Sequence, residues 1–376
     1  MKLSVRTLDG LTFLALVAAA FGLRAIDLDS TALSGREMSL LRHAAFGAHW
    51  WGELTGDGRP SMDFYAVGPV YEIALSLWSL VSRDAVWLRL LSAGASALVV
   101  GWTYLLAARR ASRSWATAAA VLVLVHPYSQ DAGRIVSAQA LATLFLVVSA
   151  DFALLWLGST SGKGRRLAIA FGLLALYTHP IAWLYVAFLA AAALFALYRP
   201  GLSAKTALLP IGALAVLGAP MLPAVIGRIT GAMNCDDMSV PQAMFQWAQV
   251  LPFGKGDGSL FWLVFKAMAG WPVPALVTIF GLGIAQGLLG LYGGWRLRFS
   301  VLLSLWAIGG ALLIDGSVCF FGALDLAPYA PFWLSCVAAG MMGLATSGSK
   351  PLRVLGYAAW LTVPTLMVSP ILFSLM

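Results

Sequence analysis

Residues 88–108 read LRLLSAGASALVVGWTYLLAA, and Arg109 and Arg110 follow them directly. A helix needs about 20 predominantly apolar residues to cross the hydrocarbon core of a bilayer. This stretch is long enough, and Arg89 is its only charged residue. The pattern predicts a transmembrane helix that ends in a basic connection.

The composition of the whole chain agrees with that reading. The chain has 376 residues, of which 60% are hydrophobic and 11% charged, and its mean hydropathy is +0.85. An ordinary soluble domain is about 45–50% apolar and about 25% charged. The excess of apolar residues excludes a soluble enzyme, a disordered regulator and a disulfide-stapled secreted module, and it predicts an integral membrane protein.

Apolar runs of the same kind recur along the chain. With 88–108 they predict an all-α fold, a polytopic transmembrane helical bundle of about 11 spans. The run at 70–82 is too short for a secure crossing, and we expect it to form an interfacial helix in the first outer loop. We divide the chain into residues 1–228, a core of first spans and first outer loop, and 229–376, a variable outer loop and C-terminal transmembrane helices. The other runs are 8–26, 114–128, 135–157, 167–178, 180–198, 205–227, 271–293, 299–315, 322–345 and 354–374.

Basic residues predict how the chain is oriented. Five connections carry lysine and arginine but no acidic residue, and the positive-inside rule assigns all of them to the cytoplasm. We therefore expect a multi-pass protein of the plasma (inner) membrane with a cytoplasmic N-terminus and an extracytoplasmic active face. The net charge of +8 then reports topology, so no nucleic-acid partner is expected. The basic residues are Arg109, Arg110 and Arg113; Lys163, Arg165 and Arg166; Arg199 and Lys205; Arg296 and Arg298; and Lys350 and Arg353, with Lys2 and Arg6 near the N-terminus.

Acidic residues concentrate in two long outer loops, residues 27–85 and 228–266. In the first loop, apolar residues between Leu33 and Phe46 recur at near-helical spacing around Arg36 and Glu37, which is typical of an amphipathic helix in the membrane interface. Either these charges carry function or they only solvate the helix. The same two readings apply to Asp236 and Asp237 in the second loop.

Two further observations concern an acidic residue within a span and a pair of cysteines. Asp151 lies within a span, and Arg165 or Arg166 of the following connection is its expected partner. Cys235 and Cys319 both fall outside the spans, and whether they form a disulfide stays open.

Several short segments occur in an order that is characteristic of one family. Together they resemble the membrane glycosyltransferases of the GT-C class, specifically the bacterial relatives of protein O-mannosyltransferase and aminoarabinose transferase (glycosyltransferase family 39-like). The resemblance covers about residues 1–200 and has two departures. Arg36-Glu37 stands where the family has Asp-Glu, and Gly133 stands where relatives commonly have Arg. The segments are Arg24, Leu33-Ser34-Gly35-Arg36-Glu37, Phe64-Tyr65-Ala66-Val67-Gly68-Pro69-Val70-Tyr71, Trp87-Leu88-Arg89-Leu90-Leu91-Ser92-Ala93, His126-Pro127-Tyr128-Ser129-Gln130-Asp131-Ala132-Gly133-Arg134 and Leu176-Tyr177-Thr178-His179-Pro180.

The resemblance implies an inverting glycosyltransferase that moves a sugar from a polyprenyl-phosphate donor to an acceptor outside the cytoplasm. A general base must take the acceptor's hydroxyl proton, and cations must stabilise the leaving phosphate. We expect membrane lipids, a lipid-linked sugar, a glycan, lipid or protein acceptor, and partner membrane subunits as binding partners. The expected residues are Glu37 and Asp63 for catalysis; Arg134, Asp131 and His179 for the donor phosphate; Arg36, Asp236 and Asp237 for acceptor or loop contacts; and Glu37 and Asp131 for Mg²⁺ or Mn²⁺.

Two other functions remain open. One is a catalytically inactive GT-C-like subunit that binds a lipid-linked glycan or stabilises a membrane assembly, which the loss of the first carboxylate at Arg36 favours. The other is a transporter of lipid-linked sugars, which predicts more charges inside the spans than the sequence contains. We rank it last.

Overall fold

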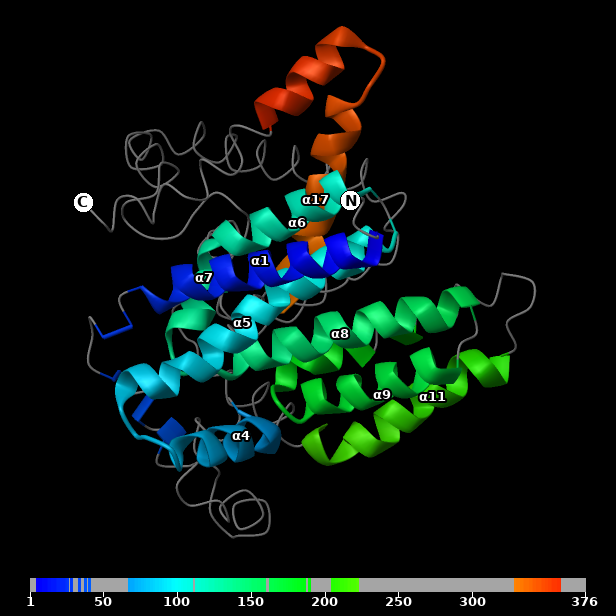
Figure 1. The fold of residues 1–376 in the computed structure, drawn as a ribbon. Coiled ribbons are helices and arrows are strands. Elements are labelled where there is room, and N and C mark those ends of the chain that lie inside the picture. The colour runs from blue at the N-terminus through cyan, green and yellow to red at the C-terminus, as the bar shows by residue number, and fades with distance from the viewer. Residues whose placement is uncertain are drawn as a thin grey trace, which may run out of the picture.

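The computed structural model is a bundle of helices, and its described part contains no β-strand (Figure 1). It describes residues 5–26, 28–29, 33–34, 37–38, 40–41, 67–110, 112–159, 162–186, 189–190, 204–222 and 328–359. The α-helices are α1 (Val5–Ala25), α4 (Pro69–Ser79), α5 (Ala85–Ala108), α6 (Arg113–Val125), α7 (Pro127–Arg134), α8 (Ala138–Ser159), α9 (Gly162–Leu176), α11 (Ala204–Gly218) and α17 (Ala330–Ala345), with short 3₁₀ turns at Pro180–Ala182 and Ala219–Met221.

Three described helices are long and apolar enough to cross a membrane: Thr7–Ala25, Ala85–Ala108 and Ala138–Leu157. They coincide with the runs predicted at 8–26, 88–108 and 135–157, so the polytopic helical bundle is confirmed. The number of spans stays a prediction. The runs at 271–293 and 299–315 lie outside the described residues.

The run at 114–128 is not one helix. It divides between α6 and α7, because the ring of Pro127 disfavours helical backbone at the residue before it. His126 is extended there, with φ −66° and ψ 122°, and Pro127 begins α7. The break turns α7 into a short separate helix that carries the candidate residues Asp131 and Arg134.

Helix α5 lies at the centre of the described bundle, where it contacts α1, α6, α7 and α8 (Figure 1). Small residues allow the close approach. A Cβ atom on Gly101 would lie 2.5 Å from Val17 of α1. Most of the α5 side chains are buried, among them Arg89, Ser92 and Ser96. A polar side chain on this helix therefore faces other protein groups, not solvent.

Helix α4 has 11 residues and is about 16 Å long, too short for a hydrocarbon core of about 30 Å. Its beginning is fixed by backbone hydrogen bonds, since Gly68 N donates to Thr178 O at 2.9 Å and Val70 N to Tyr177 O at 2.9 Å. A Cβ on Gly68 would lie 2.2 Å from Tyr177 O, so only glycine permits this approach. Two segments that carry the family resemblance are thus in direct contact.

The other end of α4 is fixed to the start of α5 by two tryptophans. The Trp78 and Trp87 rings stack with centroids 4.6 Å apart, and each indole N–H donates to the carbonyl of the other residue, at 2.7 and 2.9 Å. Ile73 and Leu77 of α4 are exposed, at 60% and 63%. A short helix with an exposed apolar face suits the predicted interfacial position, which stays a prediction.

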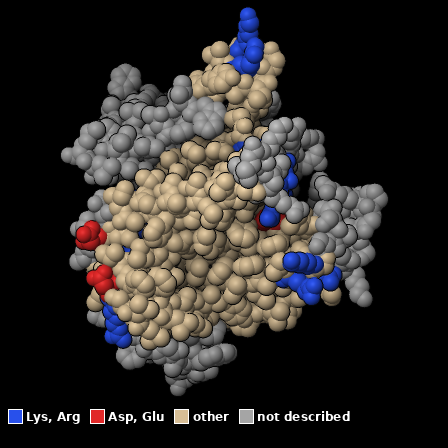
Figure 2. Space-filling model, in the orientation of Figure 1, with Lys and Arg blue, Asp and Glu red and all other residues tan. Residues whose placement is uncertain are grey.

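Charged residues are unevenly distributed over the surface of the bundle. Figure 2 shows two acidic groups at the left-hand edge, with a basic group just below them, and further lysine and arginine at the top and on the right-hand side, where an acidic group lies among them. We call the region around Arg109, Arg110 and Arg113, between α5 and α6, the basic end. There Arg113 Nε donates to Asp9 Oδ1 of α1 at 2.6 Å, and the Tyr104 hydroxyl donates to the same oxygen at 3.0 Å.

Asp151 also pairs at the basic end, but not with the predicted partners. Its buried carboxylate forms ion pairs with Arg109 and with Arg110, the latter at 3.2 Å. The expectation of Arg165 or Arg166 was wrong. Because α8 packs along α5, the arginines directly after the end of α5 lie next to Asp151.

Candidate functional site

Some of the predicted site residues are described, namely Glu37, Asp131, Arg134 and His179. Others lie outside the described residues: Arg36, Asp63, Asp236 and Asp237, together with Cys235 and Cys319. The candidate site is therefore built around Glu37 and Arg134.

Glu37 belongs to a local helix-start motif. Ser34 N donates to Glu37 Oε2 at 2.9 Å, and Glu37 N donates back to Ser34 Oγ at 3.3 Å. This reciprocal pair is a capping box, in which serine and glutamate three residues apart satisfy each other's backbone N–H. The motif fixes the direction in which the Glu37 side chain leaves the backbone.

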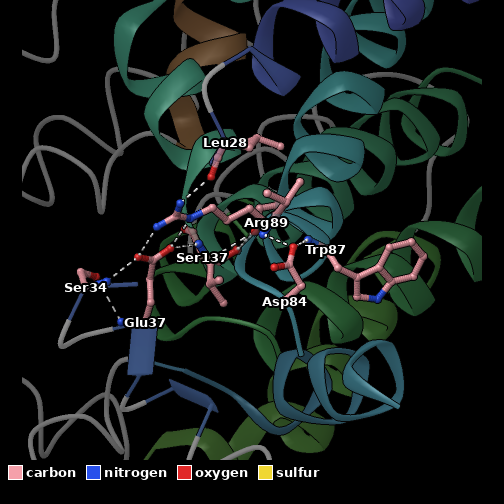
Figure 3. Close-up of polar contacts among 10 residues, drawn as sticks. Leu28, Ser34, Glu37, Asp84, Trp87, Arg89 and Ser137 are labelled. Atoms are coloured by element: carbon pink, nitrogen blue, oxygen red, sulfur yellow. Dashed lines mark hydrogen bonds and ion pairs between the residues drawn. The ribbon is translucent and has the colours of Figure 1, made fainter. Parts of the chain in front are cut away.

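That side chain forms a buried, two-pronged ion pair with Arg89 of α5 (Figure 3). Arg89 Nε donates to Oε1 at 2.9 Å and Nη2 to Oε2 at 3.0 Å. Oε1 also accepts from Val136 N at 3.0 Å. With the Ser34 bond, each carboxylate oxygen accepts two hydrogen bonds, while Glu37 and Arg89 are only 3% and 2% exposed.

These contacts change the acidity of Glu37. Burial alone raises its pKa, but the hydrogen bonds from Arg89, Val136 and Ser34 and the charge of Arg89 outweigh it and lower the pKa from 4.5 to about 2. A general base needs an oxygen within reach of the acceptor hydroxyl. Since all the acceptor positions of Glu37 are occupied, this geometry favours a structural role, and the base role stays a prediction.

Arg24, at the end of α1, is buried without exposed surface. Its Nε donates to Ser96 Oγ of α5 at 2.7 Å, Nη1 to Ala20 O at 3.1 Å and Nη2 to Ser129 Oγ of α7 at 3.0 Å. All three acceptors are neutral. In the described part of the chain no carboxylate pairs with this guanidinium.

Arg134, at the end of α7, lies beside Arg24 and interacts with it electrostatically. Its Nη2 donates to Leu23 O at 3.0 Å, while its buried Nε has no hydrogen-bond partner among the described residues. We call Arg24, Arg134, Ser96 and Ser129 the arginine cluster. Two guanidinium groups without a described acidic partner form a place where an anion would be stabilised, and planar guanidinium suits phosphate oxygens.

Gly133 explains how the two arginines fit together. A Cβ at this position would lie 2.8 Å from Arg24 Cδ and 3.0 Å from Ser96 Cβ. The residue that departs from the family pattern is thus the one that makes room for the Arg24 side chain. The neighbouring Arg134 supplies the second cation.

The other predicted phosphate ligands have less direct support. Asp131 shares α7 with Arg134, and His179 is buried in the turn after α9 that anchors α4. No group of three His, Cys, Asp or Glu among the described residues could hold a metal ion. Because the lone pairs of Glu37 are occupied, this carboxylate does not fit a Mg²⁺ or Mn²⁺ ligand in this arrangement.

Sequence reasoning gave no role to two residues of this site. Arg24 and Arg89 enter the family resemblance only as motif residues, yet each is the centre of a buried polar network. A signal for both existed, since a charged residue inside an apolar run requires a partner or a function. Ser96 and Ser129 carried no such signal.

Comparison with known proteins supports the same fold. No protein-family model matches the sequence, and no curated protein matches it significantly. Among solved structures, ArnT from Cupriavidus metallidurans bound to undecaprenyl phosphate matches with a TM-score of 0.53 and 13% identity, over 94% of this chain and 69% of that chain. Its apo state matches with 0.52 and 14%, over 97% and 74%.

An oligosaccharyltransferase from Archaeoglobus fulgidus, tethered with an acceptor peptide, matches with a TM-score of 0.49 and 13% identity, over 94% of this chain and 54% of that chain. That match is too weak to carry an argument. The ArnT matches show the fold, so the chain shares the helical architecture of ArnT. The resemblance inferred from the sequence is confirmed at the level of fold.

Proposed function

We propose that this protein is a membrane glycosyltransferase that moves a sugar from a polyprenyl-phosphate donor to an acceptor. The observation that carries the proposal is the arginine cluster, in which buried Arg24 and its neighbour Arg134 pair with no carboxylate among the described residues. The fold likeness to ArnT, which binds undecaprenyl phosphate, supports a lipid-linked phosphate as the anion.

In the proposed reaction, the acceptor hydroxyl oxygen forms a bond to the anomeric carbon while the bond from that carbon to the donor phosphate breaks. The phosphate oxygen leaves with the electron pair, and Arg24 and Arg134 stabilise its growing negative charge. A base takes the hydroxyl proton. Glu37 and Asp63 are the candidates from the sequence, and the occupied lone pairs of Glu37 favour Asp63.

The proposed setting is the inner membrane, with a cytoplasmic N-terminus and the arginine cluster near the extracytoplasmic side. The basic end supports this orientation, since positively charged connections stay in the cytoplasm. Glycan, lipid or protein acceptors, partner membrane subunits, contacts of Arg36, Asp236 and Asp237 with the acceptor, and roles of Asp131 and His179 at the donor phosphate remain part of the proposal. No step is assigned to a metal ion.

One observation favours a second function, that of a non-catalytic subunit which binds a lipid-linked glycan. Arg36 replaces the first carboxylate of the family pair, and Glu37 is held by four N–H donors. Such a chain would keep the phosphate site and lack the base. The two functions therefore share donor binding and differ in turnover.

Binding of undecaprenyl phosphate to the purified protein in lipid nanodiscs tests the shared step. We expect Arg134→Gln to weaken binding by roughly tenfold or more, because a charge-assisted phosphate contact contributes over 1 kcal/mol. Arg83→Gln is the matched control, since Arg83 is exposed in the α4–α5 connection. If the wild type does not bind the lipid, or if both variants bind equally well, the phosphate site is refuted.

Turnover separates the two functions. We expect the wild type to transfer sugar from a polyprenyl-phosphate donor to a membrane acceptor, and Asp63→Asn to abolish transfer while leaving donor binding intact. Donor binding without any transfer by the wild type would instead support the non-catalytic subunit.

A further inference from the structure

We propose that Glu37 and Arg89 form a positioning pair that holds the two arginines of the cluster in place for the lipid phosphate. This inference rests on the proposed function. It assigns Glu37 a structural role instead of that of a base, because the pair contacts the chain four residues after Arg24 and two residues after Arg134.

The first contact fixes the end of α1. Arg89 Nη1 donates to Leu28 O at 2.6 Å, and Leu28 follows Arg24 by four residues. Helix α1 has ended at Ala25, so this carbonyl has no regular helical partner. The bond from Arg89 therefore limits how far the segment after Arg24 can move away from α5.

The second contact fixes the break between α7 and α8. Val136 N donates to Glu37 Oε1 at 3.0 Å, two residues after Arg134. Ile135 is extended, with φ −114° and ψ 161°, so no helix satisfies this amide. Arg134 in turn donates to Leu23 O at 3.0 Å, which joins the two segments to each other.

One face of α5 organises the whole arrangement. Arg89, Ser92 and Ser96 lie at helical spacing, so they follow one another along the same side of the helix. Arg89 holds Glu37, Ser92 Oγ accepts from Ser137 N at 3.0 Å, and Ser96 Oγ accepts from Arg24 Nε at 2.7 Å. Val136 N donates to Glu37 Oε1, so its acceptor comes from Glu37 and not from a residue of α5.

A positioning pair and a catalytic base predict different defects. Loss of a base lowers kcat and leaves donor binding unchanged, and it gives Arg89 no comparable role. Loss of a positioning pair displaces Arg24 and Arg134, so donor affinity falls, and the two partners act as one unit. The affinity lost is then that of the charge-assisted phosphate contacts of Arg24 and Arg134.

The test is a double-mutant cycle on undecaprenyl phosphate affinity in nanodiscs with Glu37→Gln, Arg89→Gln and the double variant. We expect each single variant to weaken binding roughly tenfold, and the double variant to be no more than about twofold weaker than either single one. The control cycle uses Asp9→Asn and Arg113→Gln, an ion pair at the basic end, which should change affinity less than about twofold.

Arg89→Gln leaves a buried carboxylate and could fail to fold, so Arg89→Lys provides a second variant that keeps the charge but not the two-pronged contact. Hydrogen exchange at the Val136 amide gives a readout that does not depend on ligand. We expect Glu37→Gln to speed this exchange by tenfold or more and Asp9→Asn to leave it unchanged.

The outcomes distinguish failure of the positioning pair from failure of the proposed phosphate site. If the wild type binds the lipid and Arg134→Gln loses it while the Glu37 and Arg89 variants bind normally, the positioning pair is refuted and the phosphate site stands. Unchanged exchange at Val136 in Glu37→Gln also refutes the positioning pair. If the wild type binds no lipid phosphate, the proposed function fails, and the pair has no phosphate site to position.

Discussion

Arg24 and Arg89 are two buried arginines on neighbouring helices with opposite surroundings. They are 0% and 2% exposed, and each donates at least three hydrogen bonds. Arg89 faces a carboxylate that satisfies its charge. Arg24 donates to two hydroxyls and a carbonyl and lies beside a second arginine. The two guanidinium groups are therefore about equally buried, but among the described residues a carboxylate neutralises only that of Arg89.

From this difference in neutralisation we infer a structural role for Arg89 and a functional role for Arg24. A buried ion pair satisfies both of its charges, and removing one partner leaves the other uncompensated, at about 3–5 kcal/mol. A buried cation without a counter-ion already carries such a cost in the folded state. A protein retains it where an anion from outside provides the missing charge. We therefore expect Arg89 to stabilise the fold and Arg24 to bind an anionic ligand.

The largest expected effect follows directly from this contrast. Arg89→Gln should lower the free energy of unfolding by about 3–5 kcal/mol, because Glu37 would stay buried without its partner. Arg24→Met should change the free energy of unfolding by less than about 1 kcal/mol, since a buried charge without a described counter-ion is removed. Ser96 Oγ still donates to Ser129 O at 2.9 Å.

Equilibrium unfolding in mixed micelles measures both variants, and lipid-phosphate binding is measured in parallel. Arg24→Met should bind undecaprenyl phosphate at least roughly tenfold more weakly despite its intact stability. Equal destabilisation by the two substitutions would show that the contrast between the arginines has no functional meaning.

The second prediction uses pH to remove the charge of Glu37. Its pKa is lowered from 4.5 to about 2 by Arg89, Val136 and Ser34 against the opposing effect of burial. A lowered pKa stabilises the folded state above the unfolded value, and this stabilisation is lost as pH falls from about 4.5 to about 2. The expected loss is about 3 kcal/mol.

Unfolding measured between pH 5 and pH 2 should therefore show a steeper decline for the wild type than for Glu37→Gln, which has no proton to bind at this site. Both are compared in an Asp9→Asn background, because Asp9 pairs with Arg113 and also titrates. Parallel pH profiles would mean that the Glu37–Arg89 pair does not stabilise the fold as its geometry indicates.

The sequence predicts the framework of this molecule better than its contacts. Apolar runs locate α1, α5 and α8, because a membrane span needs a length and composition that few other segments have. The predicted partner of Asp151 was wrong for a related reason. Hydropathy assigns residues to an end of the bundle but does not say which helices are neighbours, and the arginines come from the segment directly after α5 instead of from α9.

The candidate site divides in the same way. The Ser34–Glu37 capping box is readable from spacing alone, since it is a local motif. Arg89 lies 52 residues from Glu37, and Ser129 lies 105 residues from Arg24. Such pairs depend on how α1, α5 and α7 pack, which no local pattern contains. The sequence predicts Glu37 as a site residue, but its four N–H donors could not be predicted from local sequence.

The third prediction moves Arg24 without changing its charge. Gly133→Ala places a Cβ 2.8 Å from Arg24 Cδ and 3.0 Å from its Nε, so the side chain must shift. We expect lipid-phosphate affinity to fall roughly fivefold, equivalent to about 1 kcal/mol. Gly94→Ala of α5 is the matched control, because nothing lies within 4 Å of its added methyl group.

Titration of undecaprenyl phosphate into both variants gives the comparison. Gly94→Ala should bind as the wild type does and be slightly more stable, since alanine favours a helix interior over glycine by about 0.5–1 kcal/mol. If Gly133→Ala binds normally, the position of Arg24 does not control phosphate affinity, and the functional half of the contrast fails.

The smallest expected effect concerns the Ser34–Glu37 capping box, which holds the carboxylate partner of Arg89. Ser34→Ala removes the hydroxyl that accepts from Glu37 N at 3.3 Å, but the Ser34 backbone N–H that binds Oε2 at 2.9 Å remains. We expect a loss of about 0.5–1 kcal/mol in unfolding free energy, as for other helix caps. Affinity for the lipid phosphate should change less than about twofold, because the four N–H donors to Glu37 are all retained. Unfolding and binding measured on the same preparation check this. A loss of affinity as large as that of Glu37→Gln would mean that the helix start itself, and not the ion pair with Arg89, orders the segment beside Arg134.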